Sequence, residues 1–401
     1  MPASPSTARA INDRLALRLL QQEGPLTAGR LKQLTGLSRP TVADLVERLT
    51  ASGLITVVGE SGAQRRGPNA RLYGIVADRA HLAALDVRTE SVTVTVSDLL
   101  GRELAGASAP VVGDTGTGAA VERAVTLVER AAKEAGAARL HTVGIGAPGL
   151  IDPVTGELRD TTGLPAWHRR LVAALQQRMP HTRVTVENET NLAALAEQRD
   201  GAARDRDTFV LLWLGHGIGA AVVLDGMLRR GASGGTGEIG FLPVPGTGRP
   251  PSATDCAGGF HSLAGSAAVV DLAGRYGLSG AGTGPEPAAA ELVRRAVCGE
   301  ATGAAGFLDA LAGRLALGAA SVAAVLDPGC VVLGGEVGQA GGETLAARVA
   351  ERVREMSPLP TEVRAGELGG GAVLRGAVLM ARDRAQEELF TPLGPPTHPT
   401  R

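Results

Sequence analysis

"VTVENETNLAALAE", Val184–Glu197, changes from an alternating strand pattern to a helical pattern, and a polar cluster marks the change. Glu187 and Glu189 flank Asn188, and Asn191 follows. The cluster has three interpretations: a pair of acid–base groups, a clamp for a polar ligand, or the cap of a helix. In the third interpretation, Asn191 caps a helix that starts one residue later. The rest of the chain has to decide among them.

Length and composition place the chain among cytoplasmic globular proteins. Its 401 residues predict two or three domains, because a single core rarely grows past roughly 250–300 residues. No apolar run approaches the ~18 residues of a membrane span, and the N-terminus lacks the pattern of a signal peptide. Three scattered cysteines, Cys256, Cys298 and Cys330, argue for a reducing compartment. We therefore expect a cytoplasmic protein without a membrane partner.

Charge is distributed unevenly along the chain. The formal net charge is −1, but residues 1–79 hold eleven Lys or Arg and six Asp or Glu residues. This segment therefore carries +5 and the remainder carries −6. A small basic module on a larger acidic body indicates a polyanionic partner for the module alone.

The basic module contains the signals of three helices and two strands. Residues 8–21 are amphipathic, and Thr27 can cap a second helix that ends at Gly36. Ser38 is a suitable N-cap for a third helix, with Pro40 just inside its start. Two short strands, "LITVVGE" and "ARLYGIV", follow and are joined by a polar loop. The apolar face expected for the first helix consists of Ile11, Leu15, Leu19 and Leu20.

This order of elements is typical of a winged helix-turn-helix. The helix that starts at Ser38 would enter the DNA major groove, and the loop between the strands would reach phosphates or the minor groove. The alternative is a protein-interaction domain whose Arg residues form a solvated face, but charge, capping and the strand pair together favour DNA. Asp44 is expected to tune specificity or solvate a face. The residues expected at the DNA interface are Ser38, Arg39, Thr41, Asp44, Arg48, Arg65 and Arg66.

From Leu82 onward, the sequence has the pattern of an α/β body. "HLAALDVRTESVTVTVSDLLG" predicts two strands and a turn at Gly101, and residues 117–135 predict an amphipathic helix. "GCVVLGGEV" predicts a buried strand, followed by a helix near Leu345–Met356. Several strands end in Gly-rich loops, which is where α/β proteins form their ligand crevices.

Six motifs follow one another through this body: "VGIGAPGLID", "LPAW", "VENETNLAALAE", "GHGIGAAVVLDG", "GEIG" and "DPGCVVLGGEV". In order and spacing they resemble the ROK family, which joins sugar kinases with sugar-responsive repressors. The resemblance covers about residues 10–390 and implies an actin-like, ribonuclease-H-like architecture of two α/β lobes around a cleft. A winged helix ahead of such a body is similar to the regulator branch of the family, whose repressors are homo-oligomers.

The expected domain boundaries follow from the patterns and from this resemblance. Residues 7–77 form the winged helix-turn-helix, 80–190 with 374–389 the small lobe, and 191–373 the large lobe. The Pro-containing segments 1–6 and 390–401 are expected to be disordered.

Three parts of the family's kinase machinery are altered in this chain. The first phosphate loop, "LDVRTES", keeps Asp86 but places Arg88 and Thr89 where the family has glycines that let backbone N–H groups approach phosphate. The second loop has His216 where the family has Thr. Glu189 stands at the position of the general base, which is Asp in the family, and a displacement of about 1 Å costs about 10²-fold in rate. We therefore expect no phosphoryl transfer and no bound ATP.

Arg88 itself has an expected role in the altered loop. It is expected to pair with Asp86 or another acid of the cleft and to fill the vacated phosphate site.

The resemblance also implies a structural zinc site, which this sequence lacks. The family His that follows Gly-Glu-Ile-Gly is Phe241, and the cysteine run is reduced to Cys256, with His261 nearby. Two side chains cannot supply the four ligands of a structural zinc. We expect no metal, and hydrophobic packing by Phe241 and Phe260 in its place.

The effector site implied by the resemblance is less polar than that of family kinases, because Phe241 replaces a His and Gly163 an Asn. Such losses change selectivity strongly, so the cleft is left to bind a different sugar, another small polar metabolite, or nothing. Glu187 is expected to end a strand at the surface and is not part of this site. The implied effector residues are Gly149, Asn188, Glu189, Glu238 and Ser262.

Three functions follow from these features. The first is a DNA-binding transcription regulator, expected to be a repressor, that forms a homodimer or tetramer on double-stranded operator DNA. The second is an active ATP-dependent sugar kinase fused to a DNA-binding module. The third is an interaction protein that binds a partner through the cleft. The altered loops and the basic module favour the regulator.

Overall fold

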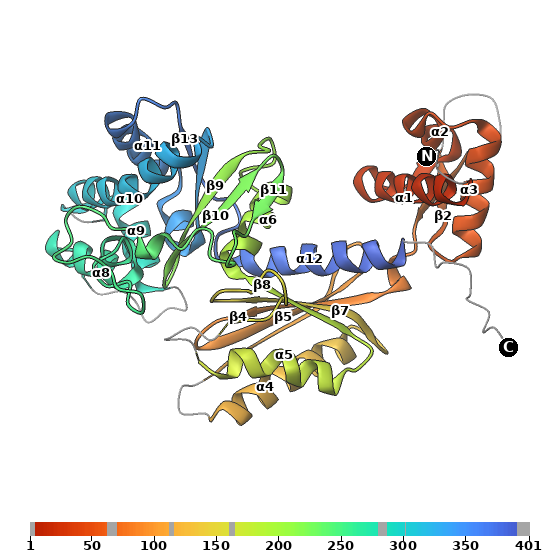
Figure 1. Ribbon diagram of the computed structural model, residues 1–401, viewed down its shortest axis with the longest axis horizontal. Helices are drawn as coiled ribbons and strands as arrows, with labels where there is room; N and C mark the ends of the chain where they lie inside the picture. The colour runs from red at the N-terminus through yellow and green to blue at the C-terminus, as the bar shows by residue number, and fades with distance from the viewer. Residues whose placement is uncertain are drawn as a thin grey trace.

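The computed structural model describes residues 5–61, 70–111, 116–159, 165–279, 287–300 and 302–390. They form a winged-helix domain and two α/β lobes, which confirms the predicted fold class (Figure 1). Helix α1 begins at Pro5, within the segment 1–6 that was expected to be disordered. Residues 1–4 and 391–401 lie outside the described residues, as do Arg65, Arg66 and Gly163.

The winged-helix domain has the predicted helices and strands. Thr27 caps the second helix by accepting a hydrogen bond from the Arg30 backbone N–H, and Gly36 ends that helix in the left-handed conformation. Ser38 caps the third helix, as predicted. A three-stranded sheet of order β1-β3-β2 closes the domain. Its elements are α1 (Pro5–Glu23), β1 (Leu26–Thr27), α2 (Ala28–Thr35), α3 (Arg39–Ala51), β2 (Ile55–Ser61) and β3 (Ala70–Ile75).

The apolar face expected for α1 is partly wrong. Ile11 and Leu15 are 58% and 39% exposed, whereas Ala16 and Leu17 are fully buried. The sequence offers two overlapping apolar stripes on this helix, and the stripe that contains Leu17 and Leu20 packs on the domain. Periodicity alone could not choose between the stripes, because the choice depends on where the other helices lie.

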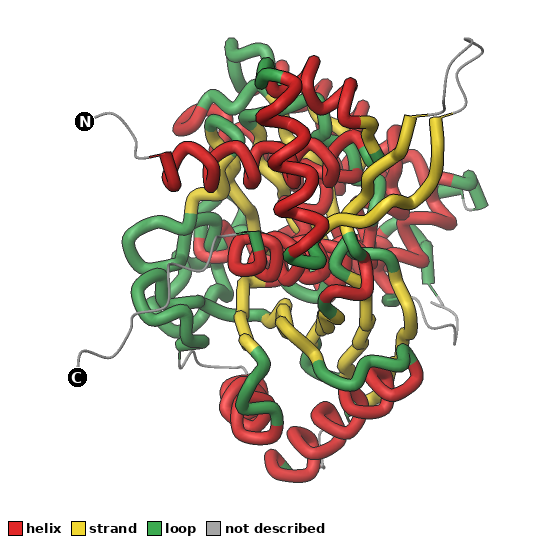
Figure 2. The backbone as a smooth tube through the Cα atoms, turned by 90° about the vertical axis from the view of Figure 1, so that its right-hand side faces the viewer, coloured by secondary structure: helices red, strands yellow, loops and turns green. Residues whose placement is uncertain are grey.

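The small lobe is a five-stranded sheet of order β6-β5-β4-β7-β8 with helices on both faces. Helices α4 and α5 lie side by side beneath one face, whereas α12 crosses the other (Figures 1 and 2). Strands β4, β7 and β8 are parallel, so their carboxyl ends meet at one edge. The elements are β4 (His81–Val87), β5 (Ser91–Asp98), β6 (Glu103–Pro110), α4 (Thr117–Glu134), β7 (Leu140–Ala147), α5 (Trp167–Arg178), β8 (Arg183–Asn188) and α12 (Ala372–Leu389).

The large lobe is built on a second five-stranded sheet, of order β11-β10-β9-β12-β13. Its first elements are α6 (Glu189–Asp200), β9 (Phe209–Leu214), β10 (Ile218–Leu224), β11 (Met227–Arg229), α7 (His261–Ala264) and α8 (Ser266–Arg275). The remaining elements are α9 (Ala288–Val297), α10 (Ala304–Leu326), β12 (Cys330–Gly334), α11 (Gly335–Met356) and β13 (Glu362–Ala365).

Two helices of the large lobe need comment. Helix α11 starts at Gly335, earlier than the expected Leu345, and breaks at Gly342, whose φ is +51°. Its Gly-rich first half hides the helical pattern.

Helix α10 is the one described helix that is long and apolar enough to cross a membrane, but half of its apolar window is buried in the lobe. A core helix passes the same test of length and composition.

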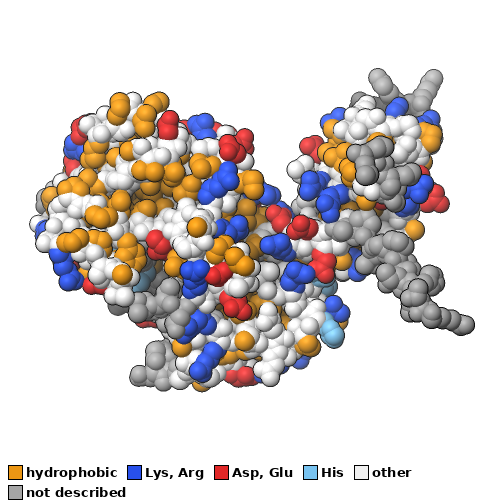
Figure 3. Space-filling view, viewed as in Figure 1, with side chains coloured by type: hydrophobic (Ala, Val, Ile, Leu, Met, Phe, Trp, Pro, Cys, Tyr) orange, Lys and Arg blue, Asp and Glu red, His pale blue; other side chains and the backbone are white. Residues whose placement is uncertain are grey.

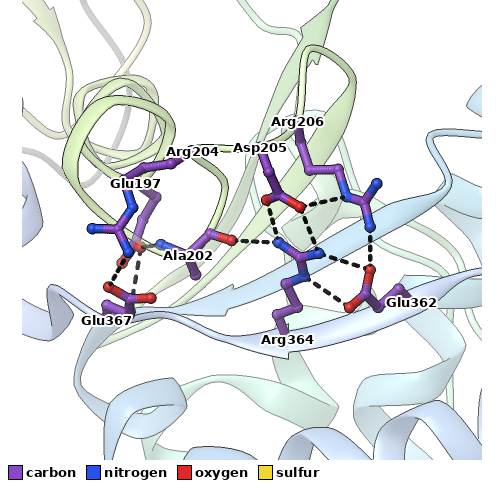
Figure 4. A network of polar contacts seen from close by, with 8 residues as sticks. All are labelled: Glu197, Ala202, Arg204, Asp205, Arg206, Glu362, Arg364 and Glu367. Atoms are coloured by element: carbon purple, nitrogen blue, oxygen red, sulfur yellow. Dashed lines mark hydrogen bonds and ion pairs between the residues drawn. The ribbon is translucent and has the colours of Figure 1, made fainter.

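The buried carboxylate of Glu197 fixes the C-terminal end of α6. It accepts hydrogen bonds from the backbone N–H groups of Ala202 (2.8 Å), Glu367 (3.2 Å) and Leu368 (3.0 Å). Beside it, Arg364 bridges Asp205 and Glu362, so these segments are joined by side chains as well as by the sheet (Figure 4). A Cβ atom at Gly201 would lie 2.1 Å from the Glu197 carboxylate, so only glycine fits there.

The substitution Glu197→Gln tests this fixation, because an amide replaces one acceptor oxygen with a donor. At least one backbone N–H would lose its acceptor, and we expect the free energy of unfolding to fall by about 2–4 kcal/mol. Urea unfolding followed by circular dichroism measures the change. Glu351→Gln, on the exposed side of α11, is the matched control. Equal midpoints for the two variants would contradict the role of Glu197.

Candidate functional site

The first candidate site is the exposed N-terminal turn of α3. The Ser38 hydroxyl accepts a hydrogen bond from the Thr41 backbone N–H at 3.3 Å and lies 2.8 Å from the Thr41 hydroxyl. Arg39 is exposed between them. The three residues therefore form a polar surface at the N-terminus of the predicted recognition helix. Figure 3 shows Lys and Arg side chains on the visible face of this domain.

Arg48 is placed differently from the sequence prediction. Its guanidinium donates to the Asp13 carboxylate on α1 at 2.6 Å and also to Asp44 on its own helix. The hydrogen bond that Arg48 donates to Asp13 raises the pKa of Arg48 above its ordinary range. This arrangement assigns Arg48 to the packing of α1 against α3. DNA contact by Arg48 and Asp44 stays a prediction. The ion pairs argue against it, because they already engage both side chains.

Two further basic residues of the domain, Lys32 and Arg71, are exposed and were missed by sequence reasoning. Their sign and position in a basic module were the available signals. They extend the basic surface beyond the first turn of α3.

The second candidate site lies between the two lobes, at the turn that follows β4. Arg88 donates to Asp86 at 2.9 Å, to Glu336 at the start of α11 at 2.5 Å, and to the Gly370 carbonyl oxygen at 2.9 Å. Pairing of Arg88 with Asp86 and a second acid is confirmed. Burial raises the pKa of Asp86, and the positive charge of Arg88 opposes that shift. We call these contacts the Arg88 bridge.

The role of Asn188 in the opening segment is that of a helix cap. Its side-chain oxygen accepts hydrogen bonds from the backbone N–H groups of Thr190 (2.8 Å) and Asn191 (3.3 Å). Its amide nitrogen donates to the Gly149 carbonyl oxygen at 3.0 Å and to Glu189 at 3.1 Å. All the hydrogen-bonding groups of this side chain are therefore engaged within the chain. Effector binding by Asn188 stays a prediction that would require some of these bonds to be exchanged.

Two expectations for this segment are wrong. The helix starts at Glu189, so Asn191 is not its N-cap; instead its side-chain amide donates to Glu187 at 3.0 Å. Glu187 is not at the surface but is 5% exposed, and it accepts a hydrogen bond from Arg230 at 2.7 Å. A buried carboxylate needs such partners, and Arg230 is distant in sequence, so the strand pattern could not reveal the pair.

Glu189 is the first residue of α6. Burial, followed by the negative charges of Glu238 and Asp86, raises the pKa of Glu189 to about 8. Burial also raises the pKa of Glu238. The negative charge of Glu238 contributes to the raised pKa of Glu189, and effector binding by these two residues stays a prediction. Ser262 is exposed and its hydroxyl donates to the Gly259 carbonyl oxygen at 2.7 Å.

The region of the family's zinc site is only partly as expected. Phe260 is fully buried, but Phe241 is 39% exposed, so the expected hydrophobic packing holds for Phe260 and only in part for Phe241. A short 3₁₀ turn, Ile239–Phe241, carries this ring towards solvent. Among the described residues, no group of three or more His, Cys, Asp or Glu side chains could hold a metal ion. The absence of zinc stays a prediction.

Comparison with known proteins gives two family matches and several relatives. A model of the ROK family matches residues 83–384, and a model of the MarR family matches residues 11–67. The N-acetylglucosamine repressor of Escherichia coli O6:H1 is 26% identical over 244 residues, 59% of this chain and 58% of the repressor. The xylose repressor of Bacillus subtilis is 24% identical over 251 residues, 60% and 62% of the two chains. The chain thus spans about six tenths of the length of these relatives.

Solved structures show the same fold. A ROK family transcriptional regulator, a homolog of the E. coli MLC protein, has a TM-score of 0.75 at 21% identity and covers 96% of this chain and 98% of its own. A ROK hexokinase from Thermus thermophilus has a TM-score of 0.60 at 29% identity, covering 77% and 99%. A ROK glucokinase from Streptomyces griseus in complex with glucose and AMPPNP has a TM-score of 0.60 at 26% identity, covering 76% and 100%.

The raised pKa of Glu189 predicts a pH dependence of stability. The folded chain holds a proton that an unfolded Glu releases above its ordinary pKa of 4.5, so stability falls as pH rises from about 4.5 to about 8. Glu189→Gln mimics the protonated form and keeps an acceptor for Asn188. We expect the wild type to lose on the order of 2 kcal/mol more than this variant between pH 5 and pH 8.5.

Urea midpoints at each pH measure the effect. Glu351→Gln, the same substitution at an exposed position of α11, serves as the control. Parallel curves for the wild type and Glu189→Gln would show that Glu189 titrates normally.

Proposed function

Because the chain belongs to the ROK family, we propose that it is a sequence-specific DNA-binding transcription regulator, and specifically a repressor. The observation that carries the proposal is the winged-helix domain ahead of the ROK body, with the exposed polar turn of Ser38, Arg39 and Thr41 at the start of α3. The match of residues 11–67 to the MarR family and the two repressors among the relatives support it.

The proposal includes loss of phosphoryl transfer. Transfer of a phosphoryl group needs glycine N–H groups around phosphate and a base that is ionised near neutral pH. Arg88 occupies a glycine position of the first loop and is engaged by Asp86 and Glu336. A pKa of about 8 leaves only a minor part of the Glu189 side chains ionised at pH 7, which reduces the fraction of chains that can accept the sugar proton.

An active sugar kinase is the second candidate, and one observation favours it. The ROK hexokinase and glucokinase structures cover about three quarters of this chain at 29% and 26% identity. The alterations argue against it, because Arg88 and His216 stand where the family has residues that hold phosphate and the longer side chain of Glu189 displaces the base.

The cleft supports a small polar effector. Glu189 and Glu238 supply hydrogen-bonding groups, and the partly exposed Phe241 supplies an apolar ring in the segment next to Glu238. Sugars present this combination of hydroxyls and apolar faces, so we propose a sugar or a sugar-like molecule. We further propose a cytoplasmic homodimer or tetramer, because two copies of a winged helix match a palindromic operator.

DNA recognition by α3 predicts that Arg39→Ala weakens binding about 10–100-fold, the worth of one base or phosphate contact. The probe is a duplex enriched by the full chain from a random-sequence pool, and fluorescence anisotropy at several salt concentrations gives the affinity. Arg130→Ala, an exposed arginine on α4, is the matched control. Failure to enrich any duplex with salt-sensitive binding would overturn the regulator proposal.

Loss of catalysis predicts no ATP turnover. We expect no ADP release above the protein-free background when the chain is incubated with Mg²⁺, ATP and a panel of neutral and amino sugars. The S. griseus glucokinase with glucose serves as the positive control. Sugar-dependent ADP release would contradict the loss of activity and would support the second candidate function, an active sugar kinase.

A further inference from the structure

Helix α12 contacts both candidate sites, the cleft at one end and the winged-helix domain at the other. In Figure 1 it runs from the large lobe across the small-lobe sheet to the base of the winged helix. The contacts at its two ends and along its length suggest what this position does.

The N-terminal end of α12 comes directly after a turn that contacts the Arg88 bridge. The turn Gly369–Gly371 precedes the helix, and the carbonyl oxygen of Gly370 accepts a hydrogen bond from Arg88 at 2.9 Å. A Cβ atom at Gly370 would lie 3.1 Å from the Glu336 carboxylate, so this turn presses against the bridge. Just before it, the N–H of Leu368 donates to the buried Glu197. A change in the bridge therefore acts directly on the start of the helix.

The middle of α12 lies in direct backbone contact with two elements, helix α6 and strand β7. A Cβ atom at Gly376 would lie 2.0 Å from the Leu192 carbonyl oxygen of α6. A Cβ atom at Gly144 of β7 would lie 2.7 Å from the Ala377 carbonyl oxygen. Contacts this close leave no side chains between the elements that could be compressed. We therefore expect α12 to move as a rigid body, either together with α6 or by sliding along it.

The C-terminal end of α12 belongs to the core of the winged-helix domain. Ala381, Ala385 and Phe390 are buried in the same apolar cluster as Leu17 and Leu20 of α1. The amide nitrogen of Gln386 donates to the Gln21 side-chain oxygen of α1 at 2.8 Å and to the Leu99 carbonyl oxygen at 2.9 Å. This buried amide specifies one orientation of α1 relative to the small lobe, which an apolar contact alone would not do.

We propose that α12 couples the cleft to the DNA-binding domain. A ligand that rearranges the Arg88 bridge shifts the Gly369–Gly371 turn, and α12 carries this shift to α1 through the Gln386–Gln21 contact. The proposal rests on the proposed regulator function, but the coupling itself is a property of the chain without DNA. Energetic couplings of this kind amount to about 5–150-fold in affinity.

The first experiment measures hydrogen–deuterium exchange of the full chain by mass spectrometry. Arg88→Ala breaks the bridge, and we expect faster exchange around residues 367–372 and also in the distant C-terminal half of α1 and residues 385–390. Glu336→Gln breaks the same ion pair with little change of shape and replaces Arg88→Ala if that variant does not fold. Arg178→Ala, which removes the two exposed ion pairs of Arg178 with Glu122 and Glu129 in the small lobe, is the control and should change neither region.

A double-variant cycle separates transmission from general loosening. Gln386→Leu removes the amide contact but keeps the length of the side chain. In the Arg88→Ala/Gln386→Leu chain, we expect residues 367–372 to stay fast while α1 no longer responds to the loss of the bridge. An effect of Arg88→Ala confined to residues near the bridge, or one that reaches α1 equally in the double variant, would overturn the proposal.

Affinity for an enriched duplex provides the functional readout. We expect Arg88→Ala to change it at least about 5-fold, and the change to vanish in the Gln386→Leu background. A chain that binds no duplex but shows the exchange pattern would retain the coupling and lose the regulator function. A chain that binds DNA with an unchanged affinity in Arg88→Ala would retain the function and lose the coupling.

Discussion

Helix α6 is fixed at both ends by side chains of its own sequence, and the arrangement of the two lobes depends on this. At its N-terminus, Asn188 closes the helix and ties it to Gly149 in the loop after β7. At its C-terminus, the buried Glu197 accepts hydrogen bonds from three backbone N–H groups of two other segments. The small-lobe sheet ends where this helix starts, so both lobes take their position from one short, doubly anchored element.

On the proposal that the chain is a regulator, the Arg88 bridge gives a physical reason why the body would not need nucleotide. A phosphate site attracts its ligand with N–H groups and positive charge. Here the positive charge belongs to the chain and is already paired with Asp86 and Glu336. We infer that the cleft no longer needs nucleotide to hold its lobes together. The two lobes then remain free to respond to a ligand that competes with the contacts of the Arg88 bridge. Helix α12 begins next to these contacts.

Local signals in the sequence were enough to predict most helices and strands and the caps at Thr27 and Ser38. The order of the family motifs was enough to predict the two-lobed body. Partners distant in the chain were beyond such signals: Arg48 with Asp13 and Glu187 with Arg230 are chosen by tertiary packing. The exposure of Phe241 was missed for the same reason, since a residue at a lost ligand position need not enter the core.

We propose that the Arg88 bridge stands in place of nucleotide in this body of the ROK fold. Titration calorimetry of the full chain with Mg²⁺ and AMPPNP tests this most directly, because it measures binding without requiring turnover. We expect no saturable heat up to millimolar nucleotide. Saturable binding with a micromolar Kd would show that the phosphate site is open in this chain and would contradict the claim.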